Sequence, residues 1–441
     1  MEILIVLLVV VALMVIAASK YKFHPFLSLL MAGIIMGFVG ELSEEEITTA
    51  LTNGFGKTLG SIGIIIAFGT IIGAYLEKSG GAKTLANWAL SAIGAKRSIL
   101  AMNITGFIVS IPVYCDSGFI ILSSLNKAIS KSSKIPVVVL AVSLAAGLYS
   151  THVFVPPTPG PLAATAALNA DLGLVILLGL VIAIPVSLIG FFWAKYIERH
   201  YKNISNNHDS VTDSKNQTIP KTSTAFMPIV IPIVLIALKS ISNYPTHPLG
   251  EGLLFDFTNF IGNPVIALLI GVFLAFKLKT NVKEATHYDW VTNGLKEAGI
   301  IILITGAGGA FGSILQATGI GNIIGNKFSD SNLGLFLPFI IAALLKTAQG
   351  SSTVSIITTA AIMAPILASF GLDSSMGRAL TVLAIGAGAM TVSHLNDSYF
   401  WVVAQFSGMN TTTALKTQTV STFLQGIVGI ILIMILGWIF I

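Results

Sequence analysis

"TNGFGKTLGSIGIIIAFGTIIGAYLEKSG", residues 52–80, has a second version further along the chain, "TNGLKEAGIIILITGAGGAFGSILQATG" at residues 292–319. Gly73 in the first copy matches Gly312 in the second, 239 residues later. The same spacing pairs Gly80 with Gly319. A spacing that recurs along two long apolar stretches predicts a chain built from two related halves.

Short apolar pieces interrupted by glycine, proline, serine or aspartate also recur at this spacing. They are too short to cross a bilayer, and they lie at residues 112–125, 152–165, 349–365 and 394–407. The repeat places Thr158 over Asp397, so the broken pieces of one half fall on those of the other. One long polar loop divides the chain. We therefore predict a first inverted repeat over residues 1–202, a cytoplasmic linker loop over 203–224 and a second inverted repeat over 225–441.

The composition indicates a membrane protein. Of the 441 residues, 54% are hydrophobic and 10% are charged, whereas a soluble protein has about 25% charged residues. Apolar runs near 20 residues predict an all-α polytopic protein with about 12 membrane segments in the lipid bilayer. Runs such as 174–194 do not alternate, which argues against a β-barrel. The first run has no basic residue before it, so we expect a retained span rather than a signal peptide.

Charges outside the apolar runs indicate orientation rather than a nucleic-acid partner. The net charge of +5 is spread over loops. Acidic residues precede the first copy of the repeat and basic residues precede the second, so equivalent spans are predicted to cross in opposite senses. An inverted-topology repeat with discontinuous helices points to a transport site near the bilayer midplane. The residues on which this orientation rests are Lys20, Lys22, Glu41, Glu44, Glu45, Glu46, Lys277, Lys279 and Lys283.

Asp116 lies in the first broken piece, between Pro112 and Gly118. A carboxylate inside a membrane segment is costly and is seldom found there without a function. Proline and glycine favour a helix break or a re-entrant tip at this point. Asp116 is therefore a candidate for binding a coupling ion or a substrate hydroxyl, with Ser117 and Gly118 beside it. The alternative is that Asp116 caps the second arm of the hairpin.

The second-half break contains Gly350, Ser351, Ser352 and Thr353, which are small donors at the start of a helix. Such a helix start can bind an anion, although small residues also serve helix packing in membranes. Lys346 lies just before it. This lysine either supplies positive charge for a carboxylate or extends its ammonium to the surface.

Two further breaks carry histidines and a second aspartate. The stretch "THVFVPPTPGP" (151–161) contains His152 near its start, and its prolines prevent a continuous helix. The stretch "SHLNDSYFW" (393–401) contains His394 and Asp397. Asp397 and His394 are candidates for proton coupling, and His152 and Thr158 for substrate binding. A buried histidine in a membrane helix can equally be a packing residue.

Other chemistries lack their motifs. HExxH, GxSxG and GxxxxGK[ST] are absent, and the single cysteine, Cys115, excludes a disulfide framework. "GAGGAFG" at 306–312 follows a membrane run, so we expect it to pack helices rather than bind a nucleotide. No cofactor and no metal site are expected.

With these motifs, the chain resembles the gluconate permease family of sugar-acid:proton symporters over essentially its whole length. The most specific stretches are "KFHPFLSLLMA" (22–32), "DSGFIIL" (116–122), "HVFVPPTPGP" (152–161), "ITGAGGAFGSIL" (304–315), "QGSSTVSIITT" (349–359) and "SHLNDSYFW" (393–401). The resemblance implies a multi-pass importer of gluconate or related hydroxy acids in the bacterial inner membrane, with D-serine transport in one branch. It also implies an inverted-repeat fold with two re-entrant hairpins, broken helices and an elevator mechanism, and we expect a homodimer.

Many gluconate permeases carry Glu-Val-Gly where this chain has Asp116-Ser117-Gly118, so other sugar acids stay open as substrates. In the implied mechanism Lys346 and residues 350–353 take the carboxylate of a small anionic sugar acid. Asp116, Asn396 and Ser398 bind its hydroxyls, and Asp397, Asp116 or His394 carries the proton. A channel or sodium-coupled carrier of the same architecture, and a membrane-embedded enzyme with an Asp116–Asp397 dyad, are the alternatives.

The charge pattern makes a topological prediction, which labelling in intact cells can test. Both termini are expected outside and residues 203–224 in the cytoplasm. A cysteine introduced by Ser210→Cys should therefore react slowly with an impermeant thiol reagent added from outside. Rapid labelling would contradict the orientation.

Overall fold

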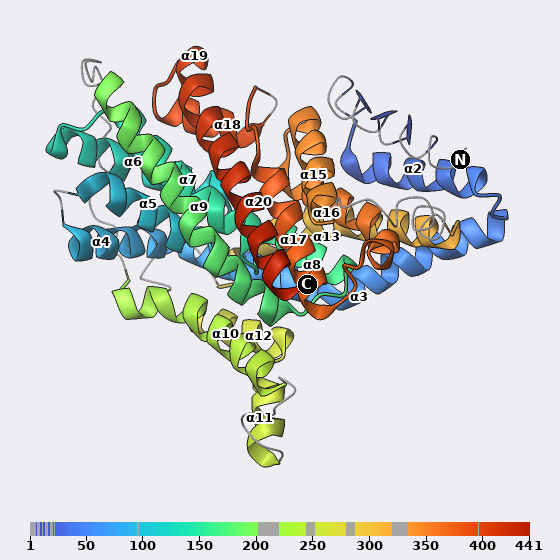
Figure 1. Ribbon diagram of the computed structural model, residues 1–441. Coiled ribbons are helices and arrows are strands. Elements are labelled where there is room, and N and C mark those ends of the chain that lie inside the picture. Colours follow the sequence, from blue (N-terminus) through green and yellow to red (C-terminus); the bar gives the residue numbers. More distant parts are fainter. Residues whose placement is uncertain are drawn as a thin grey trace.

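The structure is a computed structural model of the chain (Figure 1). It describes residues 6, 9–10, 12–13, 16–17, 21, 23–94, 97–201, 220–243, 252–278, 287–319, 334–395 and 397–441. Every regular element within these ranges is a helix, so the all-α prediction is confirmed for this part of the chain. The predicted first span and residues 203–219 of the linker loop fall mostly or wholly outside it.

The first half contains helices that pack in two groups. The long α3 runs beside α13 of the second half, and α5, α7 and α9 pack against one another in sequence (Figure 1). The helices are α2 (Pro25–Val39), α3 (Glu44–Lys78), α4 (Gly81–Ile93), α5 (Ser98–Val109), α6 (Cys115–Ser133), α7 (Val137–Phe154), α8 (Pro159–Ala167) and α9 (Leu172–Tyr201).

The second half follows the same plan, in which α15, α17 and α20 pack in sequence and α20 also contacts α9. Its elements are α10 (Thr222–Ser242), α11 (Leu253–Ile261), α12 (Pro264–Phe276), α13 (His287–Ala317), α15 (Phe336–Gln349), α16 (Ser352–Met363), the 3₁₀ turns η2 (Ala364–Ile366) and η3 (Ala368–Phe370), α17 (Ser375–Met390), α18 (Ser398–Phe406), α19 (Thr411–Ala414), the π-helical turn η4 (Leu415–Thr419) and α20 (Val420–Phe440).

Helix starts recur at the spacing found in the sequence. α2 begins at Pro25 and α12 at Pro264, 239 residues apart. The same interval separates the starts of α8 and α18, and of α9 and α19. α5 and α15, like α7 and α17, begin 238 residues apart. The α9 helix of 30 residues corresponds to the continuous run of α19, η4 and α20, Thr411–Phe440, which also has 30 residues. Helical segments therefore begin at equivalent positions in both halves.

Local sequence sets the helix ends. α3 begins with a capping box, in which the Ser43 hydroxyl accepts from the Glu46 N–H and the Glu46 carboxylate accepts from the Ser43 N–H. Asn263 is the N-cap of α12, where its side chain accepts from the Val265 N–H, and Pro264 occupies the first helical position. α15 ends at Gly350, whose φ of 86° lies in the left-handed region that glycine tolerates.

Glycines allow α3 and α13 to approach closely. A Cβ on Gly54 would lie 2.6 Å from the Gly309 carbonyl oxygen, and a Cβ on Gly306 would lie 2.6 Å from the Phe55 ring. The prediction that the glycines of 306–312 pack helices is therefore confirmed. One part of the predicted first break is wrong, because Gly118 lies inside α6 rather than in an irregular tip.

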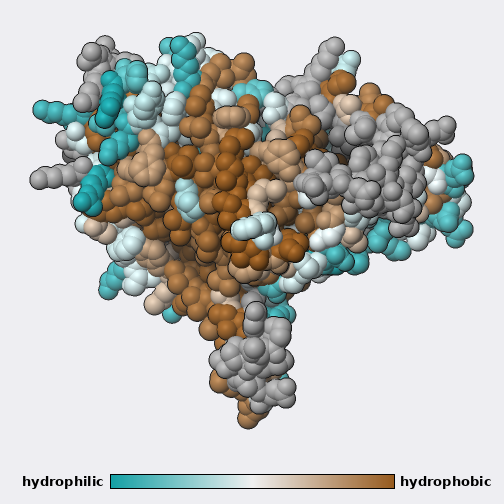
Figure 2. Space-filling model, viewed as in Figure 1, coloured by the Kyte–Doolittle hydropathy of each residue, from teal (hydrophilic) through white to brown (hydrophobic). Residues whose placement is uncertain are grey.

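Apolar helices cover much of the surface. Five described helices are long and apolar enough to cross a membrane, or up to seven if each of two bent helix pairs counts as one span. Figure 2 shows a hydrophobic face over α9 and α20. Exposed side chains of these two helices include Val181, Phe192, Ile431 and Trp438. The chain is a membrane protein, while the count of about 12 segments stays a prediction.

The close approach of α5 to α7 gives a stability prediction. A Cβ on Gly147 would collide with the Asn103 carbonyl oxygen and lie 2.8 Å from the Phe107 nitrogen. Gly147→Ala should therefore lower stability by about 1–3 kcal/mol and reduce the unfolding temperature in detergent. The control is Gly60→Ala, because a Cβ on exposed Gly60 would meet nothing within 4 Å. Equal unfolding temperatures for the two variants would contradict this packing.

Candidate functional site

Four helix breaks surround one polar cluster. They lie between α5 and α6, between α7 and α8, between α15 and α16, and between α17 and α18. Side chains from the first break contact α18, and the end of α15 contacts the start of α18. α8 packs on the start of α16, where a Cβ on Gly160 would lie 3.6 Å from the Thr353 Cα. The cluster is therefore assembled from both halves of the chain.

An ion pair lies at the centre of this cluster. The Lys346 Nζ is 2.6 Å from the Asp397 Oδ2, and the two side chains are 1% and 4% exposed. Lys346 also donates to the Gly350 carbonyl oxygen, which the left-handed turn at the end of α15 presents to it. The Tyr149 ring centroid lies 5.8 Å from the Nζ. The alternative that Lys346 extends to the surface is therefore wrong.

Asp397 is held on three sides. It is the N-cap of α18, where its Oδ1 accepts from the Tyr399 N–H at 3.1 Å. Its Oδ2 accepts from the Ser393 hydroxyl as well as from Lys346. Ser393 is fixed in turn, since its N–H donates to the Thr422 hydroxyl at 3.0 Å and its carbonyl accepts from the Thr419 hydroxyl at 2.6 Å. The start of α20 therefore positions the break that carries Asp397.

Asp116 lies at the more open side of the cluster. It is half-buried in the first turn of α6, and its Oδ2 accepts from the Ser398 hydroxyl at 3.1 Å. The Cys115 thiol lies 3.8 Å from its Oδ1. α6 begins after Tyr114 and has no side-chain cap, so the alternative that Asp116 caps this helix is wrong. Ser398 is exposed and joins Asp116 rather than Asp397.

The tip between α15 and α16 has the geometry of a helix N-terminus. The Ser351 hydroxyl accepts from the Val354 N–H at 3.3 Å and so acts as the N-cap. Ser352 is 8% exposed and Thr353 is half-buried, and both lie in the first turn of α16. Their backbone N–H groups have no partner within the helix, as in any first helical turn. The end of α15 thus brings a cation next to a site that favours anions.

The other predicted residues are placed less centrally. His152 is 4% exposed and stacks on Tyr149 at a centroid distance of 6.4 Å, and its Nδ1 has no hydrogen-bond partner among the described residues. The Thr158 hydroxyl donates to the Val155 carbonyl oxygen at 2.7 Å. The His394 Nε2 lies 2.8 Å from the Thr347 carbonyl oxygen. His394 and Thr158 therefore make backbone contacts within the breaks.

Three residues of the predicted site have other outcomes. Ser117 is half-buried beside Asp116. Gly118 leaves no room for a ligand, because it is buried and its Cβ would lie 2.8 Å from the Leu148 Cδ2. Asn396 lies outside the described residues.

The sequence-based prediction missed Tyr149, Ser393 and Tyr399. Tyr399 is buried and donates its hydroxyl to the Ala145 carbonyl oxygen at 3.0 Å, while its ring lies 5.1 Å from that of Tyr149. Tyr149 could have been noticed in the sequence, because it is a tyrosine among the mostly small and aliphatic residues of α7. For Ser393, the signal was its position four residues before Asp397.

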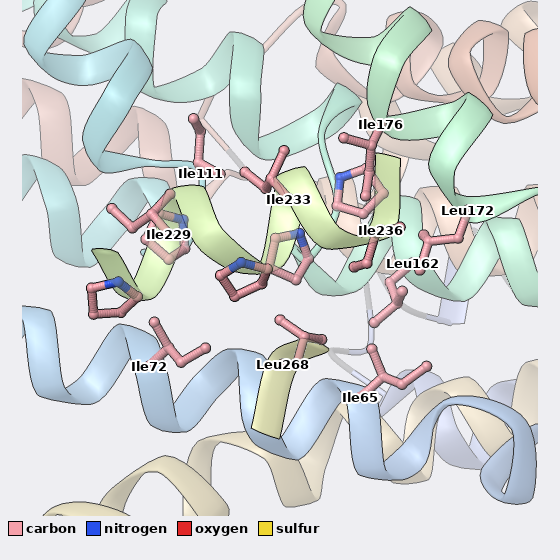
Figure 3. Close-up of a pocket in the computed structure, with 15 residues that line it drawn as sticks. Ile65, Ile72, Ile111, Leu162, Leu172, Ile176, Ile229, Ile233, Ile236 and Leu268 are labelled. Atoms are coloured by element: carbon pink, nitrogen blue, oxygen red, sulfur yellow. The ribbon is translucent and has the colours of Figure 1, made fainter. Parts of the chain in front are cut away.

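An apolar pocket adjoins the first-half breaks (Figure 3). Isoleucine, leucine and proline side chains line it. Pro112, Pro156 and Pro157 belong to the breaks, while Leu268 and Ile233 come from α12 and α10. The described residues of its wall include no polar or charged side chain, so this pocket does not suit an anion and the polar cluster is the candidate site.

Comparison with protein families gives one match over almost the full length. Residues 1–439 match the model of the GntP family permease. The chain belongs to the GntP permease family. Membership of a permease family indicates a transporter.

Individual relatives cover the permease almost completely. It is 34% identical to the inner membrane permease YgbN of Escherichia coli, over 96% of this chain and 95% of the relative. It is 31% identical to a gluconate permease of Pseudomonas aeruginosa, over 98% and 96% of the two chains. The D-serine transporter DsdX of Escherichia coli is 30% identical over 96% of each chain.

A solved transporter shares the fold. The crystal structure of the YdaH transporter of Alcanivorax borkumensis superimposes with a TM-score of 0.71, covering 95% of the permease and 99% of that chain. Sequence identity is 13%, so this likeness concerns the fold alone. The permease therefore has the fold of a known transporter.

The buried ion pair gives a second stability prediction. Lys346→Met leaves the Asp397 carboxylate buried without its cation, and breaking such a pair costs about 3–5 kcal/mol. The unfolding temperature in detergent should fall, and the double variant Lys346→Met/Asp397→Asn should recover most of the loss. Lys416→Met is the control, because Lys416 is exposed. A double variant less stable than Lys346→Met would contradict the pairing.

Proposed function

We propose that the permease is a secondary active transporter that imports a small sugar acid together with protons across the bacterial inner membrane. The observation that carries this proposal is a buried lysine, Lys346, which pairs with the Asp397 carboxylate and bonds to Gly350 just before the start of α16. A sugar acid has one anionic end and several hydroxyls, and the cluster offers a matching group for each. The names of the gluconate relatives support this substrate class.

The anionic end of the substrate would lie on Lys346 and the first turn of α16. Charge-assisted hydrogen bonds from an ammonium and from helix N–H groups suit a carboxylate. Ser352 and Thr353 add hydroxyl donors at the same place. The hydroxyl end would reach Asp116 and Ser398, which are more exposed than the ion pair and hydrogen-bond each other.

The architecture supports a carrier that alternates its access. We propose that residues 1–202 and 225–441 are inverted repeats and that residues 203–224 form a cytoplasmic linker. The recurring helix starts and the breaks at equivalent places support this division. The pairs α5–α6 and α15–α16 would act as two re-entrant hairpins that move with the substrate in an elevator mechanism.

Protons are the coupling ion of this proposal. Asp116 and Asp397 are carboxylates at helix breaks, and ionisable residues at such places in transporters serve proton relays. One proton per anion would cancel the charge moved inward, so the membrane potential would no longer oppose uptake. Sodium coupling would instead use the backbone carbonyls and hydroxyls of the breaks.

D-serine is a second candidate substrate. It carries a carboxylate and a hydroxyl like a sugar acid, but it also has an ammonium group. Lys346 pairs with Asp397, whereas the half-buried Asp116 carboxylate accepts from the uncharged Ser398 hydroxyl and could take this ammonium. The DsdX relative supports the same possibility.

Transport in proteoliposomes tests the proposal. The purified wild-type permease should exchange labelled for unlabelled D-gluconate unchanged, and should accumulate it when a proton gradient is imposed. Asp116→Asn and Asp397→Asn should abolish accumulation, because an amide cannot release a proton. At least one of the two should retain exchange, which moves no net proton. Uncoupler-sensitive accumulation in both variants would contradict the proton-coupled mechanism.

A further inference from the structure

The proposed function makes two demands on a single cation. Lys346 is to bind the carboxylate of the substrate, yet its Nζ already pairs with the Asp397 Oδ2 at 2.6 Å and donates to the Gly350 carbonyl. The Lys346 side chain is 1% exposed, so solvent water does not hydrogen-bond to its ammonium group in place of these partners. A substrate carboxylate arriving here meets a lysine that an internal carboxylate occupies.

The charges in the site determine what binding of a substrate carboxylate requires. With both aspartates ionised, Lys346, Asp397 and Asp116 sum to one negative charge, and a bound anion would bring the sum to two. An uncompensated negative charge in a poorly solvated site has a high free energy, which favours protonation of one of the carboxylates. Among the described residues, the other titratable groups near the ion pair include Cys115, Tyr149, His152, His394 and Tyr399.

We propose that Asp397 is a built-in competitor for Lys346, which the substrate carboxylate displaces, and that the displaced Asp397 takes up the proton that is transported. This inference rests on the proposed function and specifies its coupling step. An O–H bond forms on the Asp397 carboxyl with a proton from water on the uptake side. It breaks again on the release side, when Lys346 returns to Asp397.

The surroundings of Asp397 suit both of its forms. The Ser393 hydroxyl now donates to Oδ2, but a hydroxyl can also accept, so it can turn to receive the proton of a neutral carboxyl. The Tyr399 N–H stays bound to Oδ1 in either form, as an N-cap contact. Asp116 differs, because its hydrogen-bond partner is the uncharged Ser398 hydroxyl rather than the Lys346 ammonium.

The break that carries Asp397 is suited to a shift. Val392 has a φ of 56°, in the left-handed region that is a genuine outlier for a β-branched residue. Backbone strain of this kind is held at functional and switching segments by the surrounding structure. Here the Thr419 and Thr422 hydroxyls hold the backbone of the next residue, Ser393. If Lys346 releases Asp397, this segment can shift and carry the Asp397 carboxyl group away from the lysine, while Asp397 keeps its hydrogen bond to the Tyr399 N–H of α18.

The consequence is coupling without leakage. While Lys346 holds Asp397, the carboxylate stays ionised and no proton crosses with the empty carrier. While the substrate holds Lys346, the buried Asp397 is uncompensated and requires a proton. Substrate and proton therefore bind together, at a ratio of one to one for this site.

The test measures protons taken up on binding. Isothermal titration of purified permease with D-gluconate, in buffers of different ionisation enthalpy between pH 7 and 8.5, should give an uptake of about one proton per ligand in the wild type. The dissociation constant should rise about tenfold per pH unit, as linkage of one proton requires. Asp397→Asn should bind about tenfold to a hundredfold more tightly, the worth of one charge-assisted hydrogen bond, with no proton uptake.

A matched variant tests a rival acceptor. His394→Gln should keep the uptake of about one proton, since the His394 ring contacts the Thr347 carbonyl oxygen rather than Lys346. Wild-type binding without proton uptake, or uptake that persists in Asp397→Asn, would overturn the inference while leaving sugar-acid transport in place. Absence of D-gluconate, L-idonate and D-serine binding to folded wild type would instead overturn the proposed function, and this inference with it. The wild-type measurement decides the matter even if Asp397→Asn does not fold.

Discussion

The site depends on one constraint, which is that the buried Lys346 ammonium needs a partner. Taking an ammonium and a carboxylate out of water costs several kcal/mol each, and their attraction compensates only when further hydrogen bonds satisfy both groups. The permease meets this requirement with two helix ends. Gly350 turns the end of α15 so that its carbonyl accepts from Lys346, and the start of α18 brings Asp397 with its bonds to Ser393 and Tyr399.

Helix breaks make this arrangement possible inside an apolar molecule. A continuous helix satisfies its own backbone and offers no donors or acceptors to a ligand, whereas a break exposes N–H and carbonyl groups that must find partners. Here the two halves of the chain provide breaks at equivalent places, and the breaks meet. Glycines on α3 and α13 let these long helices pack closely, which keeps the two halves together around the cluster.

Much of this plan could be predicted from the sequence. Hydropathy gave the helical membrane class, and the repeat of 239 residues anticipated helix starts such as those of α8 and α18. Proline and glycine positions located the breaks, and Asp116, Lys346 and Asp397 were all named as site residues. These features are local, because they depend on composition, period and residues that interrupt helices.

The partners of these residues could not be predicted in the same way. Lys346 and Asp397 are 51 positions apart, and Asp116 and Ser398 are 282 apart. Such pairs depend on how α6, α15 and α18 pack. For this reason the hydrogen bond between Ser398 and Asp116 was not predicted, and Gly118, which was placed in the site beside Asp116, packs on Leu148 instead. The supporting contacts of Ser393 with Thr419 and Thr422 come from a helix distant in sequence and carried no signal.

A cryo-electron microscopy structure of the permease with D-gluconate bound tests the proposed exchange of partners at Lys346 most directly. Ligand density is expected between Lys346, the first turn of α16 and Asp116, with the ligand carboxylate on Lys346 and the Asp397 carboxylate moved off it. Density in the apolar pocket or at another place, or an intact Lys346–Asp397 pair beside a bound ligand, would contradict it.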